Sequence, residues 1–116
     1  MTATDYPTYR TELLGTLGRM RRSLPEVMGG FNDLHRSALH DGELSTATKE
    51  LIALAIGVAA RCDGCIAFHV SAALRAGETR AEIEEALGVA ILMGGGPTAM
   101  YAAEAFEALD QFTAAE

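Results

Sequence analysis

The residues of this chain with the clearest chemical potential lie in one short stretch, Ala60 to Val70, which reads ARCDGCIAFHV. It holds the only two cysteines of the sequence, Cys62 and Cys65, and His69 follows four residues after the second. A Cys-x-x-Cys pair can bind a metal, attach a haem, form a structural disulfide or carry out redox chemistry. The residues around the pair help to distinguish these uses.

A helix that begins near Cys62 or Asp63 brings the reactive groups onto one surface. At about 3.6 residues per turn, Cys62, Cys65 and His69 then lie on the same face. The thiolate is the reactive form of cysteine, and the positive end of the helix dipole favours it. The neighbouring Arg61 and the imidazole one turn beyond Cys65 favour it as well. The spacing therefore predicts at least one activated thiol.

A carboxylate on the preceding helix can orient the histidine. If residues 46–60 and 63–76 form an antiparallel hairpin, Glu50 lies roughly 16 Å from the turn and His69 roughly 12 Å, at about 1.5 Å per residue. Their side chains can then meet, so that Glu50 orients His69 and His69 takes a proton from Cys65 beside its resolving partner. The alternative is that Glu50, near the start of its helix, faces solvent.

Other uses of the cysteine pair fit the sequence less well. A c-type haem requires a histidine directly after the second cysteine, where this chain has Ile66. A thioredoxin fold requires a β-α-β pattern, which the sequence lacks, and a structural disulfide is uncommon in a reducing compartment. Zinc stays open as an alternative, and its ligands would come from Cys62, Cys65 and His69 with Glu50, His35 or His40. Without such a role, His35 and His40 are expected to be surface residues.

Capping residues predict an all-α fold in a single domain, residues 1–116. Ser23 followed by Pro25 marks a helix start, and Thr79 followed by Glu82 marks another. The predicted helices lie near residues 7–21, 25–40, 46–60, 63–76, 80–93 and 97–113. The Cys-x-x-Cys then stands at the start of the fourth helix, in a central helical hairpin.

The predicted helix at 46–60 has an unusual composition, because it is apolar on almost every side. Leu51, Ile52, Leu54 and Ile56 point in different directions around it. A surface helix of a monomer normally keeps one polar face. This helix is therefore expected to be central or to lie between subunits, and together with the short chain it predicts a homo-oligomer.

The charge distribution excludes some classes of partner. The formal net charge is −7; residues 1–80 carry nine basic and nine acidic side chains, whereas residues 81–116 carry seven acids and no base. Nucleic-acid binding needs a basic patch, so we expect no nucleic-acid partner. No segment approaches the roughly 18 uninterrupted apolar residues of a membrane span, and no signal peptide is evident. These features predict a cytoplasmic protein with no membrane partner.

At this point the sequence resembles a known family. The shared features are the run Lys49 to Ala55, the Cys62-x-x-Cys65-x-x-x-His69 motif, the run Ala76 to Ile83 and the run Met93 to Pro97. Together they are similar to the alkylhydroperoxidase D branch of the carboxymuconolactone decarboxylase family, over about residues 25–110. The decarboxylases of the wider family lack the cysteine pair.

The resemblance implies a thiol-dependent antioxidant enzyme of the alkylhydroperoxidase type. Its catalytic set would be Glu50, Cys62, Cys65 and His69, in an all-α fold that assembles as trimers or hexamers. Glu50 would orient His69, and His69 would help to deprotonate Cys65 for attack on a peroxide oxygen or on a partner's disulfide. Cys62 would then close the intramolecular disulfide.

The resemblance also implies the partners of such an enzyme. The substrate would be a hydroperoxide and the reductant a lipoylated protein or another dithiol, with a peroxiredoxin as a further partner; no cofactor or metal is expected. The alternative is a disulfide reductase that serves those partners and has little direct peroxidase activity. Some family members have a histidine or an aromatic residue just before the second cysteine, where this chain has Gly64. Gly64 therefore predicts a less crowded pocket.

Overall fold

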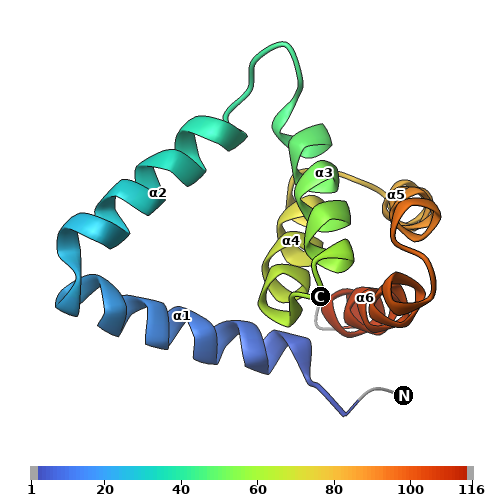
Figure 1. The fold of residues 1–116 in the computed structure, drawn as a ribbon, viewed down its shortest axis with the longest axis horizontal. Helices are drawn as coiled ribbons and strands as arrows, with labels where there is room; N and C mark the ends of the chain where they lie inside the picture. Colours follow the sequence, from blue (N-terminus) through green and yellow to red (C-terminus); the bar gives the residue numbers. More distant parts are fainter. Residues whose placement is uncertain (1–2, 115–116) are drawn as a thin grey trace.

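The computed structural model describes residues 3–114, and all regular secondary structure in that range is helical. The helices are α1 (Tyr6–Ser23), α2 (Pro25–Leu39), α3 (Thr46–Ala59), α4 (Asp63–Arg75), α5 (Arg80–Gly94) and α6 (Gly96–Ala114) (Figure 1). They follow the predicted ranges to within two residues. The prediction of an all-α fold with about six helices is thus confirmed.

The core lies where α3, α4, α5 and α6 meet, and the first turn of α1 closes one side of it. The buried residues that form it are Tyr6, Leu54, Val58, Ile66, Ala67, Val70, Ala73, Ile83, Leu87, Ala102, Ala105, Ala108 and Leu109. Alanine is frequent in this set, and its small side chain lets helix axes approach closely. The α3–α4 hairpin contacts both α5 and α6, which confirms its predicted central position.

Local capping explains most helix boundaries, with one correction. Thr79 and Glu82 form the predicted capping box, in which Thr79 N donates to Glu82 Oε1 at 2.7 Å and Glu82 N donates to Thr79 Oγ1 at 3.1 Å. The prediction that Ser23 caps α2 is wrong, because Ser23 is the last residue of α1 and Leu24 occupies the cap position. Proline disfavours helical backbone in the residue before it, so Pro25 places the break at Leu24.

The start of α1 is anchored to α6 through Tyr6. Its backbone N donates to Gln111 Oε1 at 2.8 Å, and its hydroxyl donates to Glu104 Oε2 at 3.2 Å. Burial, reinforced by the Glu104 carboxylate, raises the pKa of the Tyr6 hydroxyl well above its ordinary value. The hydroxyl therefore remains a donor throughout the physiological pH range, and this end of α1 is fixed to the bundle.

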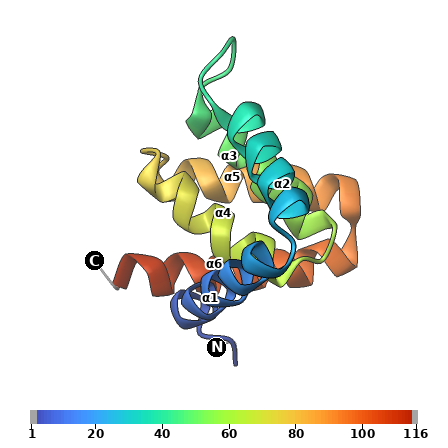
Figure 2. The same cartoon turned by 90° about the vertical axis from the view of Figure 1, so that its left-hand side faces the viewer.

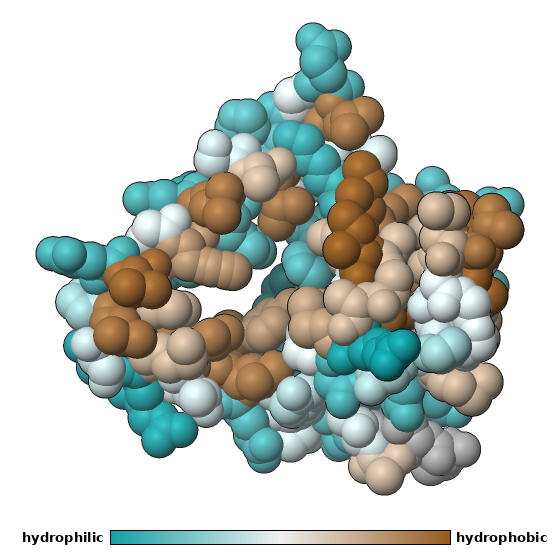
Figure 3. Space-filling model, viewed as in Figure 1, coloured by the Kyte–Doolittle hydropathy of each residue, from teal (hydrophilic) through white to brown (hydrophobic). Residues whose placement is uncertain are grey.

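The remainder of α1 and all of α2 extend away from the bundle. We call residues 14–39 the arm. Figures 1 and 2 show α1 and α2 diverging as the two sides of an open angle, with α2 crossing in front of α3 in the second view. No residue of α2 is buried among those the structure describes, and Val27, Phe31 and Leu34 are 65%, 50% and 67% exposed. Figure 3 shows hydrophobic side chains of the arm around an opening between the arm and the bundle.

Helix α3 has a second apolar face outside the core. Leu54 and Val58 are fully buried, whereas Ile52 and Ile56, which are one turn apart on another face of the helix, are 45% and 64% exposed. Its predicted central position is confirmed, and the exposed isoleucines leave apolar surface of the kind expected at a subunit contact. Among residues 3–114, none of the helices has the length and apolar character needed to cross a membrane.

Candidate active site

The turn between α3 and α4 places the cysteines at the N-terminus of α4. Cys62 N donates to Gly57 O at 3.0 Å and Arg61 N donates to Val58 O at 3.1 Å. These two bonds form a Schellman motif, in which the residue after the helix adopts a left-handed backbone. That residue is Arg61, with φ +60°. The turn closes α3 within two residues, so Cys62 stands directly at the start of α4.

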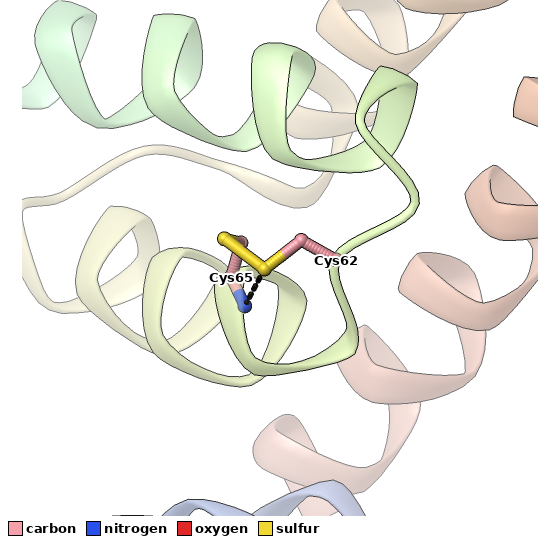
Figure 4. The surroundings of a disulfide bond; sticks show 2 residues. All are labelled: Cys62 and Cys65. Atoms are coloured by element: carbon pink, nitrogen blue, oxygen red, sulfur yellow. Dashed lines mark hydrogen bonds between the residues drawn. A yellow bond between two sulfur atoms is a disulfide. The ribbon is translucent and has the colours of Figure 1, made fainter. Parts of the chain in front are cut away.

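Cys62 is the N-cap residue of α4, in line with the predicted helix start near Cys62 or Asp63. Its Sγ accepts a hydrogen bond from Cys65 N at 3.1 Å, shown as a dashed line in Figure 4. The two cysteines are joined by a disulfide, and their Cα atoms are 5.2 Å apart. A sulfur that accepts a backbone N–H at a helix N-terminus is stabilised when it carries negative charge. Cys62 therefore occupies the place in the helix that best supports a thiolate after reduction.

The predicted contact between Glu50 and His69 is present. His69 Nδ1 lies 2.7 Å from Glu50 Oε1, across the α3–α4 hairpin, and the two side chains are 18% and 8% exposed. The alternative in which Glu50 faces solvent is therefore wrong. An ionised carboxylate only accepts hydrogen bonds, so it holds the proton of a neutral imidazole on Nδ1. His69 Nε2 is then the ring atom that can take a proton.

Close packing between the two hairpin helices depends on Gly57, which the sequence analysis did not single out. A Cβ atom at this position would lie 2.6 Å from Cys65 Cβ, a separation that real Cβ contacts do not reach. The absence of a side chain thus lets α4 approach α3 at the second cysteine. The available signal was a glycine in the last turn of an otherwise Ala- and Leu-rich helix, where glycine lowers helix stability unless close packing requires it.

The residues around Gly64 include a side chain from α1. A Cβ atom at Gly64 would lie 3.3 Å from Leu13 Cδ1, so α1 already covers this position. One turn of α4 further on, the Arg10 guanidinium carbon lies 5.5 Å from the centre of the Phe68 ring. Burial lowers the pKa of Arg10 below its ordinary value, and the Arg75 cation acts in the same direction. Helix α1 thus lies against α4 at Gly64 and at Phe68.

The two remaining histidines differ in their relation to the site. His35 of α2 was expected at the surface, and it is exposed, but its ring stacks on that of His69 with centroids 6.3 Å apart and planes 17° apart. His40 ends α2, and its carbonyl oxygen accepts from Lys49 Nζ at 2.6 Å. Within residues 3–114, no group of three or more His, Cys, Asp or Glu side chains is arranged to hold a metal ion. The geometry thus does not assemble the zinc set considered from the sequence.

Known proteins resemble this chain in sequence and in fold. The model of the carboxymuconolactone decarboxylase family matches residues 25–108. An uncharacterized protein of Cupriavidus necator is 42% identical over 111 residues, which cover 96% of this chain and 98% of that protein. An uncharacterized protein of the cox locus of Paracoccus denitrificans is 35% identical, over 85% of this chain and 89% of its own length.

Two solved structures share the fold. A carboxymuconolactone decarboxylase family protein from Legionella pneumophila is 45% identical, with a TM-score of 0.89 over 92% of this chain and 96% of that chain. A second family protein, from Thermotoga maritima, is 28% identical, with a TM-score of 0.71 over 84% of this chain and 90% of that chain. The Thermotoga protein is described as "possibly involved in antioxidative response".

Proposed function

This chain belongs to the carboxymuconolactone decarboxylase family, a family of enzymes, and on that premise we propose that it is a thiol-dependent hydroperoxide reductase. The observation that carries the proposal is the part-buried contact between Glu50 of α3 and His69 of α4, the helix that begins at the cysteine pair. A buried carboxylate and a partly buried imidazole on the dithiol's own hairpin can supply the proton transfers that thiol oxidation needs. The antioxidative role suggested for the Thermotoga maritima neighbour is in line with this chemistry.

The proposed cycle starts from the reduced pair. His69 Nε2 takes the proton of Cys65, and the thiolate attacks one oxygen of the hydroperoxide. The O–O bond breaks, the alcohol leaves with a proton, and Cys65 becomes a sulfenic acid. The Cys62 thiolate then attacks the Cys65 sulfur and releases water, which gives the disulfide present in the structure. One hydroperoxide and two thiols are thereby converted into an alcohol, water and a disulfide.

A second dithiol must return two electrons to the disulfide. We propose a lipoylated protein or another dithiol protein for this step, in the reducing cytoplasm, and a peroxiredoxin as a partner that receives electrons from the reduced pair. Exchange proceeds through a mixed disulfide, and a stabilised thiolate is the better leaving group. The hydrogen bond from Cys65 N to Cys62 Sγ stabilises Cys62 in that role.

The test is to reduce the protein, add hydroperoxide and follow the loss of free thiols. Cys65→Ser should abolish peroxide-dependent oxidation, and His69→Ala should slow it by about 10²-fold or more, the usual range for losing a general base. His40→Ala is the matched control, because it removes an exposed imidazole and keeps the backbone carbonyl that accepts from Lys49. Equal rates in the wild type, Cys65→Ser and His69→Ala would refute the proposal.

A second function is favoured by the position of Cys62, namely a disulfide reductase with little direct peroxidase activity. Cys62 is partly exposed and accepts the helix N–H, which suits attack on a protein disulfide. Activity with a lipoyl or peroxiredoxin partner, together with no thiol loss in hydroperoxide alone, would favour this function. The Cys62→Ser variant should then lose all exchange activity, whereas a peroxidase centred on Cys65 would still consume one equivalent of peroxide.

We also propose that the protein works as a homo-oligomer, a trimer or a hexamer. The exposed Ile52 and Ile56 of α3 and the apolar side chains of the arm are the surface that would be buried. A sedimentation mass equal to a single 12.2 kDa chain at micromolar concentration would contradict the proposal.

A further inference from the structure

His35 is the residue through which the arm reaches the site. It lies in the last turns of α2, and its imidazole stacks on that of His69 with ring centroids 6.3 Å apart and an interplanar angle of 17°. The arm, which contributes little to the core, thus places one ring against the proposed general base.

The junction between α2 and α3 fixes where that ring lies. Thr46 Oγ1 donates to Leu39 O at 2.7 Å, and Thr46 N donates to Asp41 Oδ1 at 2.7 Å. Lys49 Nζ donates to His40 O at 2.6 Å. These bonds tie the end of α2 to the first turn of α3, and Glu50 follows in the next turn of the same helix. The same junction therefore holds both Glu50 and His35, which contact His69 from outside α4.

The two contacts restrain the His69 ring in different ways. Glu50 binds the Nδ1 edge of the ring, which sets where that atom lies but leaves rotation about the hydrogen bond. The His35 ring lies nearly parallel to the His69 ring and displaced from it, with planes 17° apart and centroids 6.3 Å apart, which opposes tilting of the His69 ring. An imidazole that is bonded at one edge and restrained against tilting has a defined direction for Nε2. We propose that His35 is a positioning residue that fixes the plane of the His69 ring, so that Nε2 is aimed for proton transfer; this inference rests on the proposed function.

A histidine suits this place better than an aliphatic side chain would. The face of an aromatic ring stacks on imidazole, while the polar nitrogens of an exposed histidine stay hydrated. His35 can therefore lie beside His69 without leaving a further apolar group in solvent. An aromatic ring without nitrogens should keep the stacking, which gives the proposal a conservative variant.

The experiment compares His35→Ala, His35→Phe and the matched control His40→Ala in the full-length protein. The reduced variants are mixed with tert-butyl hydroperoxide and thiol loss is followed. His35→Ala should be about three- to tenfold slower than the wild type, the size expected for losing one aromatic stack in the active arrangement. His35→Phe should recover to within about twofold, and His40→Ala should equal the wild type. In a His69→Ala background, His35→Ala should add no further loss, because the residue acts through His69.

A second measurement does not depend on activity. The nitrogen-coupled NMR signals of the His69 ring should shift in His35→Ala and stay unchanged in His40→Ala. Unchanged His69 signals in His35→Ala would overturn the inference, and so would a His35→Phe variant as slow as His35→Ala. An equal slowing by His35→Ala with and without His69 would also overturn it. If instead His69→Ala and Cys65→Ser match the wild type while the His69 signals shift in His35→Ala, the proposed function fails and the positioning contact stands.

Discussion

Two turns of this protein, one after α3 and one after α4, have the same pattern of backbone hydrogen bonds but carry their glycine at different positions. After α4, Gly77 N donates to Leu74 O at 3.1 Å and Glu78 N donates to Ala73 O at 3.0 Å, the same pattern that ends α3. There the left-handed residue is Gly77, with φ +99°, whereas the turn before the cysteines has Arg61 in the left-handed position.

The two turns also differ in the residue whose carbonyl accepts the hydrogen bond from five residues further along the chain. This residue is Ala73 in the turn after α4 and Gly57 in the turn before the cysteines. At the end of α4 the glycine thus relieves the backbone, which is the ordinary solution. In the turn before the cysteines, Gly57 instead makes room for the close contact with Cys65. The left-handed position is there occupied by Arg61, whose side chain makes this backbone conformation unfavourable. The turn between α3 and α4 is therefore less stable locally than the turn after α4, and it places the charged Arg61 and the closely packed Cys65 together in the site.

The largest effect is expected from Gly57→Ala. The new Cβ would overlap Cys65 Cβ, so α3 and α4 must separate, and the free energy of unfolding of the reduced protein should fall by about 2 kcal/mol or more. The control is Gly88→Ala in α5, where an added Cβ meets no other atom within 4 Å in the described part of the chain. That variant should gain about 0.5–1 kcal/mol, since alanine favours helix. Urea unfolding measures both, and equal midpoints would contradict the packing role of Gly57.

The next largest effect is expected from Gly77→Ala in the turn after α4. This variant places a side chain on left-handed backbone, as Arg61 already does in the turn before the cysteines. At φ +99° a side chain is unfavourable, and the variant should lose about 1 kcal/mol of unfolding free energy. Peroxide-dependent thiol loss should not change, because Gly77 lies at the other end of α4. A variant that unfolds normally but reacts slowly would show that the two turns are not independent.

A smaller effect of opposite sign is expected from Arg61→Gly. Relief of the left-handed backbone should raise the free energy of unfolding by roughly 0.5 kcal/mol. Thiol oxidation should slow by about two- to threefold at low salt and less at high salt, because a screened cation next to the thiols is lost. Arg61→Lys keeps the charge and should match the wild type in rate. No gain in stability for Arg61→Gly would mean that the turn is not strained.

The smallest effect is expected at the α2–α3 junction. Here the Asp41 carboxylate, rather than a residue with left-handed backbone, accepts a hydrogen bond from the connecting backbone. The hydrogen bond from the Thr46 backbone N–H holds the pKa of Asp41 below its ordinary value. A folded-state pKa below the unfolded one contributes stability at neutral pH that is lost as the pH falls through the folded pKa. Acidification from about pH 5 to pH 2 should therefore destabilise the wild type more than Asp41→Asn. Parallel curves in thermal unfolding would refute this contribution.

Much of the fold could be predicted because its signals are local. The capping box at Thr79 and the left-handed Gly77 act within one turn, so the sequence alone places these boundaries. Ser23 shows the limit of such signals. Serine is a good capping residue, but Pro25 restricts the backbone of Leu24, so the helix break and the cap position fall at Leu24. The Glu50–His69 contact was also accessible, since the rise per residue along a hairpin determines which side chains face each other.

The rest of the site depends on packing between distant segments. Leu13 over Gly64 and His35 over His69 require the course of α1 and α2, which no periodicity in the sequence specifies. The sequence shows a glycine at position 57 but not its packing role, because that role depends on Cys65 Cβ of the next helix. These are tertiary features, and they became apparent only when the helices were placed in space.

The hydrogen bond from Cys65 N to Cys62 Sγ makes one atom both a member of the disulfide and the cap of a helix. A thiolate accepts a stronger hydrogen bond than a disulfide sulfur, so reduction should tighten the first turn of α4 and oxidation should loosen it. The coupling is reciprocal, as any linkage between two equilibria must be. A change that strengthens the first turn of α4 thus makes the dithiol harder to oxidise, and the folding energy of one helix end becomes part of the reduction potential of the enzyme.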